Sequence, residues 1–385
     1  MKRISLIVIM ALMGIGTAAA KSSTTLPFTG EVVKATNPLI QYVGRVSFAK
    51  NEAASFNFPG TSILARFQGS SLKMICRPMT GYFMAQVDGC EPFKVGFNAE
   101  RDSVVTVAAA LPKGEHQVKL MYVIEGLFRT PEFRGFVLDK GCSLVKSPDL
   151  PERKIEFIGN SITCGYGVES IEMTDPFEDE TENHWLTYAN IVSDSLNAQH
   201  TSISRSGIGV YRNYDGPKAG SDENMPWQYE YTLFNKHDEK WDFNKYQPQL
   251  VCINLGTNDL STNNYDIAHY EKNYRMFLTT VRSKYPNAKI VLITGPMLGE
   301  KESGEQREVL DRICSDANKK GFTLPEEVRK ARKGKNKGDK DIYRFDFTSQ
   351  TGDLGYGASW HPSKLQHQKM ADELLPFLRN LMGWE

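Results

Sequence analysis

The sequence predicts an α/β protein in which an antiparallel β-sandwich precedes a parallel sheet covered by helices on both faces. From about Gln41 to Asp139, short segments of alternating polarity are punctuated by turn signals such as Asp88-Gly89, a spacing typical of a sandwich. After Pro151 the pattern changes, and continuous apolar segments alternate with amphipathic helical ones. That alternation indicates a parallel sheet buried on both faces.

The predicted domains are therefore a sandwich over residues 27–145 and an α/β domain over residues 151–385, joined through the proline- and charge-rich segment 141–152. The predicted parallel strands are Ile155–Ile158, Thr201–Ser204, Leu250–Leu255, Lys289–Thr294 and Ile342–Phe347. The predicted helices carry the apolar sets Leu186/Ala189/Leu196, Ile267/Tyr270/Tyr274/Leu278/Val281, Val309/Ile313/Ala317 and Leu374/Leu378/Leu381.

The N-terminus predicts export. Lys2 and Arg3 form a basic start, Ile4–Met13 is apolar, and Ala18–Ala20 supplies the small residues that signal peptidase favours. We expect residues 1–20 to be a signal peptide, cleaved near Ala20, and the mature protein to be secreted or periplasmic. A membrane anchor is the alternative, but the apolar run is short for a bilayer span and no later stretch reaches roughly 20 apolar residues.

The charge balance disfavours nucleic acid and anionic membranes as partners. Lys and Arg number 46, as do Asp and Glu, so the chain has no net field to attract a polyanion. One basic run, Arg329–Lys340, lacks the aromatic residues that stack on bases, and we expect a solvated loop there. Of the six cysteines, Cys76 and Cys90 lie close enough in the β-rich region to be bridged, and the sequence leaves this open.

Candidate catalytic residues follow the predicted parallel strands. In sheets of this kind the ligand binds at the carboxyl ends of the strands. Gly159-Asn160-Ser161 follows the first strand, Ser206-Gly207 the second and Gly256–Asp259 the third, while Trp360-His361-Pro362 follows the last strand after a glycine-rich loop. Each block alone is typical of a cap or a turn, but their joint occurrence at one edge of a sheet predicts an active site.

These residue types suit acyl transfer. Ser161 would be a nucleophile, and His361 the base that takes its proton. Gly207 and the Asn258 amide, with the backbone N–H of Ser161, would stabilise the developing oxyanion.

The four blocks resemble those of the SGNH hydrolases, esterases with a flavodoxin-like core. More narrowly, the chain resembles carbohydrate esterase family 2, which also carries an N-terminal jelly-roll sandwich that Gly44–Val46 and Phe67–Gly69 match. The resemblance implies removal of O-acetyl groups from plant-type polysaccharides or oligosaccharides such as xylan and glucomannan, with no metal or organic cofactor. It implies Ser161 as nucleophile, His361 as base, and Ser161, Gly207 and Asn258 as the oxyanion hole.

The sequence departs from the SGNH pattern at the third member of the triad. An aspartate is usual three residues before the histidine, or two in this family, but Ala358 and Ser359 stand there. We predict a Ser-His dyad assisted by a backbone carbonyl. Trp360 is either a platform for a sugar ring or a core residue. The acidic stretch Asp175–Glu182 with His184 fits no familiar metal-ligand spacing, and we expect a solvated loop.

Two other functions stay open at this stage. The absent carboxylate is compatible with a carbohydrate-binding protein whose esterase activity is weak or lost. An SGNH lipase or thioesterase that acts on long acyl chains would carry the same blocks.

Overall fold

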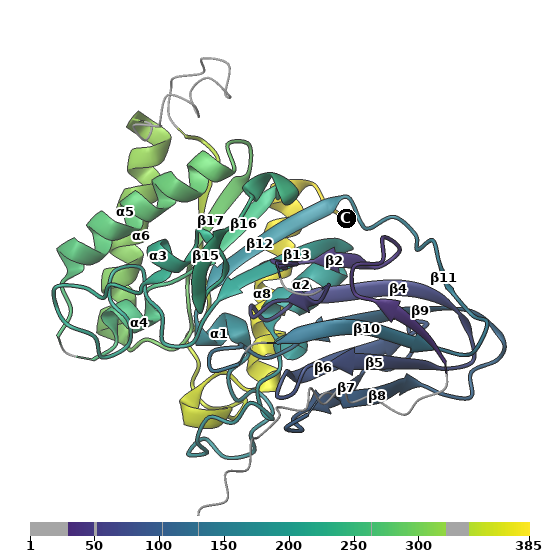
Figure 1. The fold of residues 1–385 in the computed structure, drawn as a ribbon. Helices are drawn as coiled ribbons and strands as arrows, with labels where there is room; N and C mark the ends of the chain where they lie inside the picture. Colours follow the sequence, from purple (N-terminus) through teal and green to yellow (C-terminus); the bar gives the residue numbers. More distant parts are fainter. Residues whose placement is uncertain (1–29, 50–51, 102, 130, 263, 321–338) are drawn as a thin grey trace, which may run out of the picture.

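The computed structural model describes residues 30–49, 52–101, 103–129, 131–262, 264–320 and 339–385. The predicted signal peptide and most of the basic run 329–340 lie outside these residues. A β-rich domain is followed by a domain built on a parallel sheet (Figure 1), which confirms the predicted fold class. Within the described part of the chain, none of the helices combines the length and apolar character that crossing a membrane requires.

The N-terminal domain is a sandwich of two antiparallel sheets. One sheet has the strand order β1-β10-β5-β8, with β3 beside β10; the other has the order β11-β4-β9-β6-β7, with β2 beside β4. Alternate side chains of both sheets, among them Leu72 and Met74 from one and Phe67 and Leu120 from the other, meet in one buried core. The strands are β1 (Glu31–Lys34), β2 (Gln41–Val43), β3 (Ala54–Ser55), β4 (Ser62–Gly69), β5 (Leu72–Cys76), β6 (Gly81–Val87), β7 (Phe93–Phe97), β8 (Ser103–Ala108), β9 (Gly114–Tyr122), β10 (Glu132–Leu138) and β11 (Leu144–Val145).

The second domain is a parallel sheet with the order β13-β12-β16-β17-β18. Its strands are β12 (Arg153–Gly159), β13 (Ala198–Ser204), β16 (Leu250–Asn254), β17 (Lys289–Thr294) and β18 (Ile342–Asp346). These match the five predicted strands to within three residues at either end. The first strand, β12, lies between β13 and β16, so the residue that follows it is flanked by two other strand ends.

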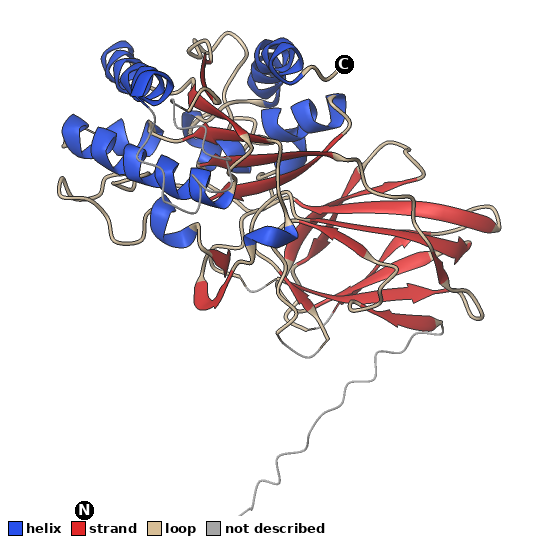
Figure 2. Cartoon of the chain, turned by 90° about the horizontal axis from the view of Figure 1, so that it is seen from above, coloured by secondary structure: helices blue, strands red, loops and turns tan. Residues whose placement is uncertain are grey.

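Helices cover both faces of this sheet (Figure 2). Ile158 of β12 packs into the core that contains α5 and α6, while Ile155 and Phe157 of the same strand pack into the core that contains α2 and α8. The helices are α1 (Ser161–Cys164), α2 (Tyr188–Ser195), α3 (Met225–Gln228), α4 (Thr257–Leu260), α5 (Ile267–Lys284), α6 (Glu300–Lys320) and α8 (Lys364–Met382), with 3-10 turns at His184–Leu186, Phe243–Lys245 and Ala358–Trp360.

Two local predictions differ from the structure. Leu186 belongs to a separate 3-10 turn and not to α2, because the Thr187 side chain caps α2 by accepting the Asn190 amide. Only the last two residues of the basic run expected to be a solvated loop are described, and of these Asp339 is fully buried and forms an ion pair with Arg282, whereas Lys340 is exposed. The sequence also gave no indication of the hairpin β14 (Tyr231–Leu233) and β15 (Lys236–Lys240).

A buried cation joins the two domains. The Arg45 guanidinium, from the sandwich, lies 5.1–5.6 Å from the ring centroids of Phe58, Tyr229, Trp241 and Phe243. Its Nη1 also donates to the Tyr231 carbonyl at 2.7 Å. Aromatic faces attract a desolvated cation, so this contact holds the sandwich against the hairpin and the 3-10 turn of the α/β domain.

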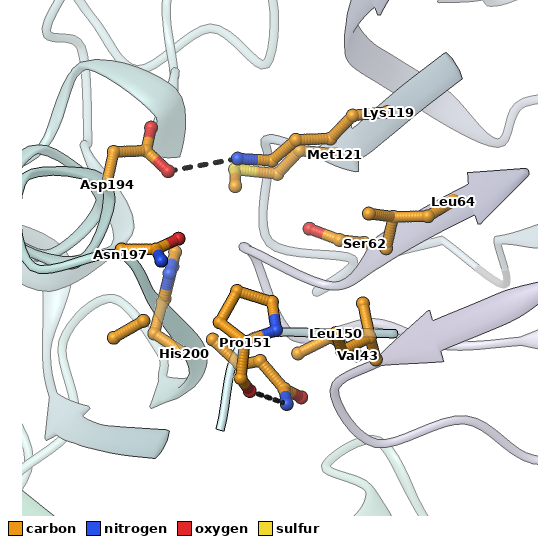
Figure 3. Close-up of a pocket in the computed structure, with 12 residues that line it drawn as sticks. Val43, Ser62, Leu64, Lys119, Met121, Leu150, Pro151, Asp194, Asn197 and His200 are labelled. Carbon is orange, nitrogen blue, oxygen red and sulfur yellow. Dashed lines mark hydrogen bonds and ion pairs between the residues drawn. The ribbon is translucent and has the colours of Figure 1, made fainter. Parts of the chain in front are cut away.

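A cavity of about 220 Å³ lies between the domains, where Lys119 and Asp194 form an ion pair at 3.1 Å (Figure 3). Ala198, the first residue of β13, lines it. The cavity is therefore at the amino end of the sheet, opposite the end where the predicted catalytic residues follow their strands. The sequence left a Cys76–Cys90 disulfide open, and the structure does not contain it, since Cys90 is an exposed free thiol and Cys76 is buried.

Candidate active site

The carboxyl ends of three neighbouring strands lie in one row. Gly159, the last residue of β12, is in register with Ser204 of β13 and with Asn254 of β16. Ser161, Gly207 and Asn258 follow these residues within four positions. The order of the strands therefore gathers three of the predicted site residues at one edge of the sheet, as the rule for parallel sheets requires.

Ser161 is the first residue of α1, directly after β12. The Asn160 side chain accepts the Ile162 amide at 3.0 Å, so it fills the N-cap position without needing a charge. Gly159 permits this tight junction, because a Cβ there would lie 2.0 Å from Thr163 Oγ1. The hydroxyl of Ser161 is thus presented from a short, rigid turn.

His361 faces Ser161. Its Nε2 lies 2.8 Å from Ser161 Oγ, and its Nδ1 lies 3.0 Å from the Ala358 carbonyl oxygen and 3.2 Å from that of Ser359. Carbonyl oxygens can only accept, so they place the proton on Nδ1 and leave Nε2 free to accept the serine proton. Backbone oxygens occupy the place of the carboxylate in a Ser-His-Asp triad.

The loop before His361 is held in an uncommon conformation. Ser359 and Trp360 both have positive φ, at 50° and 59°, which is rare for side chains other than glycine. The Ala358 amide donates to the Gly167 carbonyl at 3.0 Å. A Cβ on Gly167 would lie 2.3 Å from the Ala358 Cβ, so this glycine lets the histidine loop approach the segment that follows the nucleophile.

Tyr166 orients the imidazole from one side. Its ring stacks on His361 with centroids 4.1 Å apart and an interplanar angle of 23°. Nothing in the sequence pattern indicated this role for Tyr166. Burial lowers the pKa of His361 to about 4, although the Ala358 and Ser359 carbonyls oppose that shift. At neutral pH the imidazole is therefore uncharged, the form that a general base needs.

Asn258 contacts the residue that follows Gly207. Asn258 Nδ2 donates to the Ile208 carbonyl at 2.8 Å, and the Asn258 side chain is buried. Gly207 has φ +73°, and no described atom would lie within 4 Å of a Cβ there, so the space beside it is open. Asp259 accepts the amides of Val210, Tyr211 and Arg212 at 2.8–3.1 Å, which fixes the far end of the loop.

Trp360 is 52% exposed, which excludes the core alternative. Trp360 directly precedes His361 in the chain, and its amide donates to the Met173 carbonyl at 3.2 Å. The acidic stretch that follows Met173 is only partly the solvated loop expected from the sequence. Its last residue, Glu182, and the nearby His184 are fully buried.

Three buried groups lie near the site, and of these only Glu182 figured in the sequence-based predictions, as the last residue of the acidic stretch. One side-chain oxygen or sulfur atom from each of Glu125, Cys164 and Glu182, of the kind that can bind a metal ion, lies within 4.8 Å of the other two. Burial raises the pKa of each of these groups, which favours their neutral forms. Glu125 comes from the sandwich, so only the tertiary structure brings it to α1.

Known protein families match segments of both domains. The family model "Carbohydrate esterase 2 N-terminal" matches residues 42–148, and the model "GDSL-like Lipase/Acylhydrolase" matches residues 155–374. Cellulase/esterase CelE of Acetivibrio thermocellus is 34% identical over 351 residues, which are 90% of this chain but 40% of that protein. An acetylxylan esterase / glucomannan deacetylase of Cellvibrio japonicus is 26% identical and covers 95% of this chain and 96% of its own length.

Solved structures agree as well. A family two carbohydrate esterase from Clostridium thermocellum, in complex with cellohexaose, is 34% identical, with a TM-score of 0.79 and coverage of 90% of this chain and 100% of that one. The corresponding enzyme from Cellvibrio japonicus gives a TM-score of 0.78 at 25% identity, covering 92% of this chain and 99% of that one. The chain therefore belongs to family two of the carbohydrate esterases, which are carboxylic ester hydrolases with a GDSL-like catalytic domain.

Proposed function

We propose that this protein is exported and removes O-acetyl groups from plant-type polysaccharides or oligosaccharides, such as xylan and glucomannan, through an acyl-enzyme on Ser161. The observation that carries the proposal is the 2.8 Å contact between Ser161 Oγ and His361 Nε2, with two backbone carbonyls at Nδ1. A nucleophile, a base and an orienting group are the parts that acyl transfer requires.

In the first half of the reaction, Ser161 Oγ attacks the acetyl carbonyl carbon while its proton passes to His361 Nε2. The carbonyl electron pair moves to the oxygen, which takes hydrogen bonds from the Ser161 and Gly207 amides and from Asn258. The tetrahedral intermediate then collapses, the bond to the sugar oxygen breaks, and that oxygen takes the proton from His361. The products are acetyl-Ser161 and a free sugar hydroxyl.

In the second half, water attacks acetyl-Ser161 and gives a proton to His361. Collapse releases acetate, and the serine oxygen recovers its proton from the imidazolium. In both halves the imidazolium carries a positive charge at Nδ1–H as well as at Nε2–H. The Ala358 and Ser359 carbonyl oxygens face that charge, so they supply part of what an aspartate supplies in a triad.

The relatives and Trp360 support the proposed substrate class. Two Cellvibrio japonicus relatives are named acetylxylan esterase / glucomannan deacetylase, and the Clostridium thermocellum structure contains cellohexaose. An exposed indole beside the base offers a flat apolar face on which a pyranose ring can stack. A carbohydrate ester therefore fits the rim of this site.

Acetate release from acetylated xylan and acetylated glucomannan tests the proposal. Wild type should release acetate, Ser161→Ala should release none above background, and Ser103→Ala, which removes a hydroxyl from strand β8 of the sandwich, should match wild type. Equal rates for wild type and Ser161→Ala would contradict the enzyme assignment and favour a carbohydrate-binding protein.

A series of nitrophenyl esters separates the deacetylase from a lipase or thioesterase. We expect hydrolysis of acetyl and propionyl esters and little hydrolysis of esters with long chains. A preference for long chains would contradict the proposed substrate class. Export is tested separately: N-terminal sequencing of protein recovered outside the cytoplasm should give a mature start near residue 21.

A further inference from the structure

Glu125 is a buried carboxylate of the sandwich domain that contacts the catalytic domain. It follows strand β9 closely and is 2% exposed. Its Oε2 accepts the backbone amide of Ser206 at 2.6 Å and lies 3.8 Å from the Cys164 sulfur in α1. One side chain of the sandwich therefore contacts both the helix that begins with the nucleophile and the loop that precedes Gly207.

Glu125 is itself held in place. Its backbone amide donates to Glu182 Oε2 at 2.9 Å, and Glu182 is fully buried. Glu182 belongs to the segment between α1 and the 3-10 turn at His184, and Lys94 of the sandwich donates to its backbone carbonyl at 3.1 Å. The position of Glu125 is thus fixed by contacts from both domains.

The loop at Gly207 is anchored on both sides of the glycine. Glu125 holds the Ser206 amide, and Asn258 holds the Ile208 carbonyl. Between these anchors, the Gly207 amide donates to no acceptor among the described residues, while the Gly207 carbonyl accepts the Tyr214 amide at 2.8 Å. A free N–H between two fixed neighbours is a preorganised donor, which is what oxyanion stabilisation requires.

We propose that Glu125 is a positioning residue for the oxyanion hole, through which the sandwich domain sets the orientation of the Gly207 amide. This inference rests on the proposed function. It assigns the sandwich a role in the chemical step rather than in carrying substrate. Without an acceptor at Ser206 this partly buried amide would lose its partner, and the peptide unit before Gly207 would turn to find another.

The hydrogen bond needs an oxygen acceptor and not a negative charge. Burial raises the pKa of Glu125, although the hydrogen bonds from Ser206 oppose that shift. The neutral acid is therefore more favoured here than it is for a glutamate on the surface. Glutamine has nearly the same shape as a neutral glutamic acid and keeps a carbonyl oxygen. Methionine has a similar length but offers only a weak sulfur acceptor.

The experiment compares Glu125→Gln with Glu125→Met in the full chain, with Glu132→Met as a control for losing another buried glutamate of the sandwich. We expect Glu125→Met to lower kcat for acetyl-ester hydrolysis by about 10², the lower end of what losing one oxyanion donor causes, with KM nearly unchanged. Glu125→Gln should restore most of kcat, and Glu132→Met should leave kcat as in wild type.

Wild-type kcat in Glu125→Met would overturn the inference, as would equal losses in the glutamine and methionine variants. If Glu125→Met does not fold, hydrogen exchange on the wild type decides, because an amide held by Glu125 should exchange slowly. Rapid exchange at Ser206 in the folded protein would overturn the inference. The two proposals fail differently: an inactive wild type removes the proposed function, whereas an active wild type with an inactive Ser161→Ala and an unaffected Glu125→Met removes only the role of Glu125.

Discussion

The acid side of the pH profile should lie far below the ordinary range of a histidine. Burial lowers the pKa of His361 to about 4 from the ordinary value of 6.5, and only the neutral imidazole accepts the Ser161 proton. The activity is therefore present above the folded-state pKa and is lost as pH falls through it. At pH 5 a base with a pKa of 4 is about 90% neutral, whereas one with a pKa of 6.5 is about 3% neutral.

The quantity to measure is kcat/KM for acetate release between pH 3.5 and 8 at constant ionic strength, because it reports the pKa values of the free enzyme. Each sample is returned to pH 7 and assayed again, so that loss of the fold is separated from protonation of the base. Half-maximal kcat/KM near pH 6.5, in protein that recovers fully at pH 7, would refute the argument that burial, with no carboxylate to oppose it, lowers the pKa of His361.

A substitution at Ser359 tests the same argument in the other direction. Its φ of 50° suits asparagine and aspartate, so Ser359→Asn and Ser359→Asp should keep the loop and differ only in charge. A carboxylate near the imidazole favours the imidazolium, and opposite charges within a few ångströms shift pKa values by about 1–3 units. The midpoint for Ser359→Asp should lie at least one unit above that for Ser359→Asn, and coincident profiles would contradict the reasoning.

Three further changes have expected outcomes. His184 and His200 are buried with their Nε2 atoms 3.0 Å apart, and burial lowers the pKa of His184 to about 4. The free energy of unfolding should therefore fall by about 3 kcal/mol from His184 alone as pH drops from 6.5 to 4. A pH-independent denaturation midpoint over that range would contradict this prediction. Asp339→Ala should cost about 3–5 kcal/mol by removing the carboxylate that faces the buried Arg282 guanidinium, measured by urea unfolding against the exposed control Asp353→Ala. Trp360→Ala should raise KM for polysaccharide more than for nitrophenyl acetate, and equal changes would exclude a sugar platform.

The sequence located the residues that follow strands and missed those that reach the site from elsewhere. Ser161, Gly207 and Asn258 lie within four residues of strand ends, and parallel strands bring such residues together whatever the loops do. His361 was recognisable from the glycine-rich loop after the last strand. The roles of these residues stay predictions, but the structure places Ser161 and His361 in hydrogen-bond contact.

The sequence predicted that a backbone carbonyl orients His361, but not which residue supplies it. Backbone carbonyls carry no residue-type signature, and which ones reach Nδ1 depends on the positive φ angles of Ser359 and Trp360. Serine and tryptophan are not residue types from which a positive φ would be predicted. Glu125 was out of reach for a different reason: its contact with Ser206 spans 81 positions and joins two domains, and neither its own strand nor the target loop has a pattern that points to the other.

The two domains are better regarded as one catalytic unit than as an enzyme with an appended module. A module that only carries substrate would meet its neighbour through exposed, adaptable contacts, as interfaces between independent domains usually do. Here the sandwich instead places Arg45 among four aromatic rings of both domains and Glu125 against the Ser206 amide, and both side chains are almost fully buried. Removing the sandwich would expose the aromatic cage and leave the Ser206 amide without its acceptor. Loss of activity on such truncation would therefore say nothing about substrate binding, whereas the exchange of Glu125 for glutamine or methionine changes one hydrogen bond and leaves the interface in place.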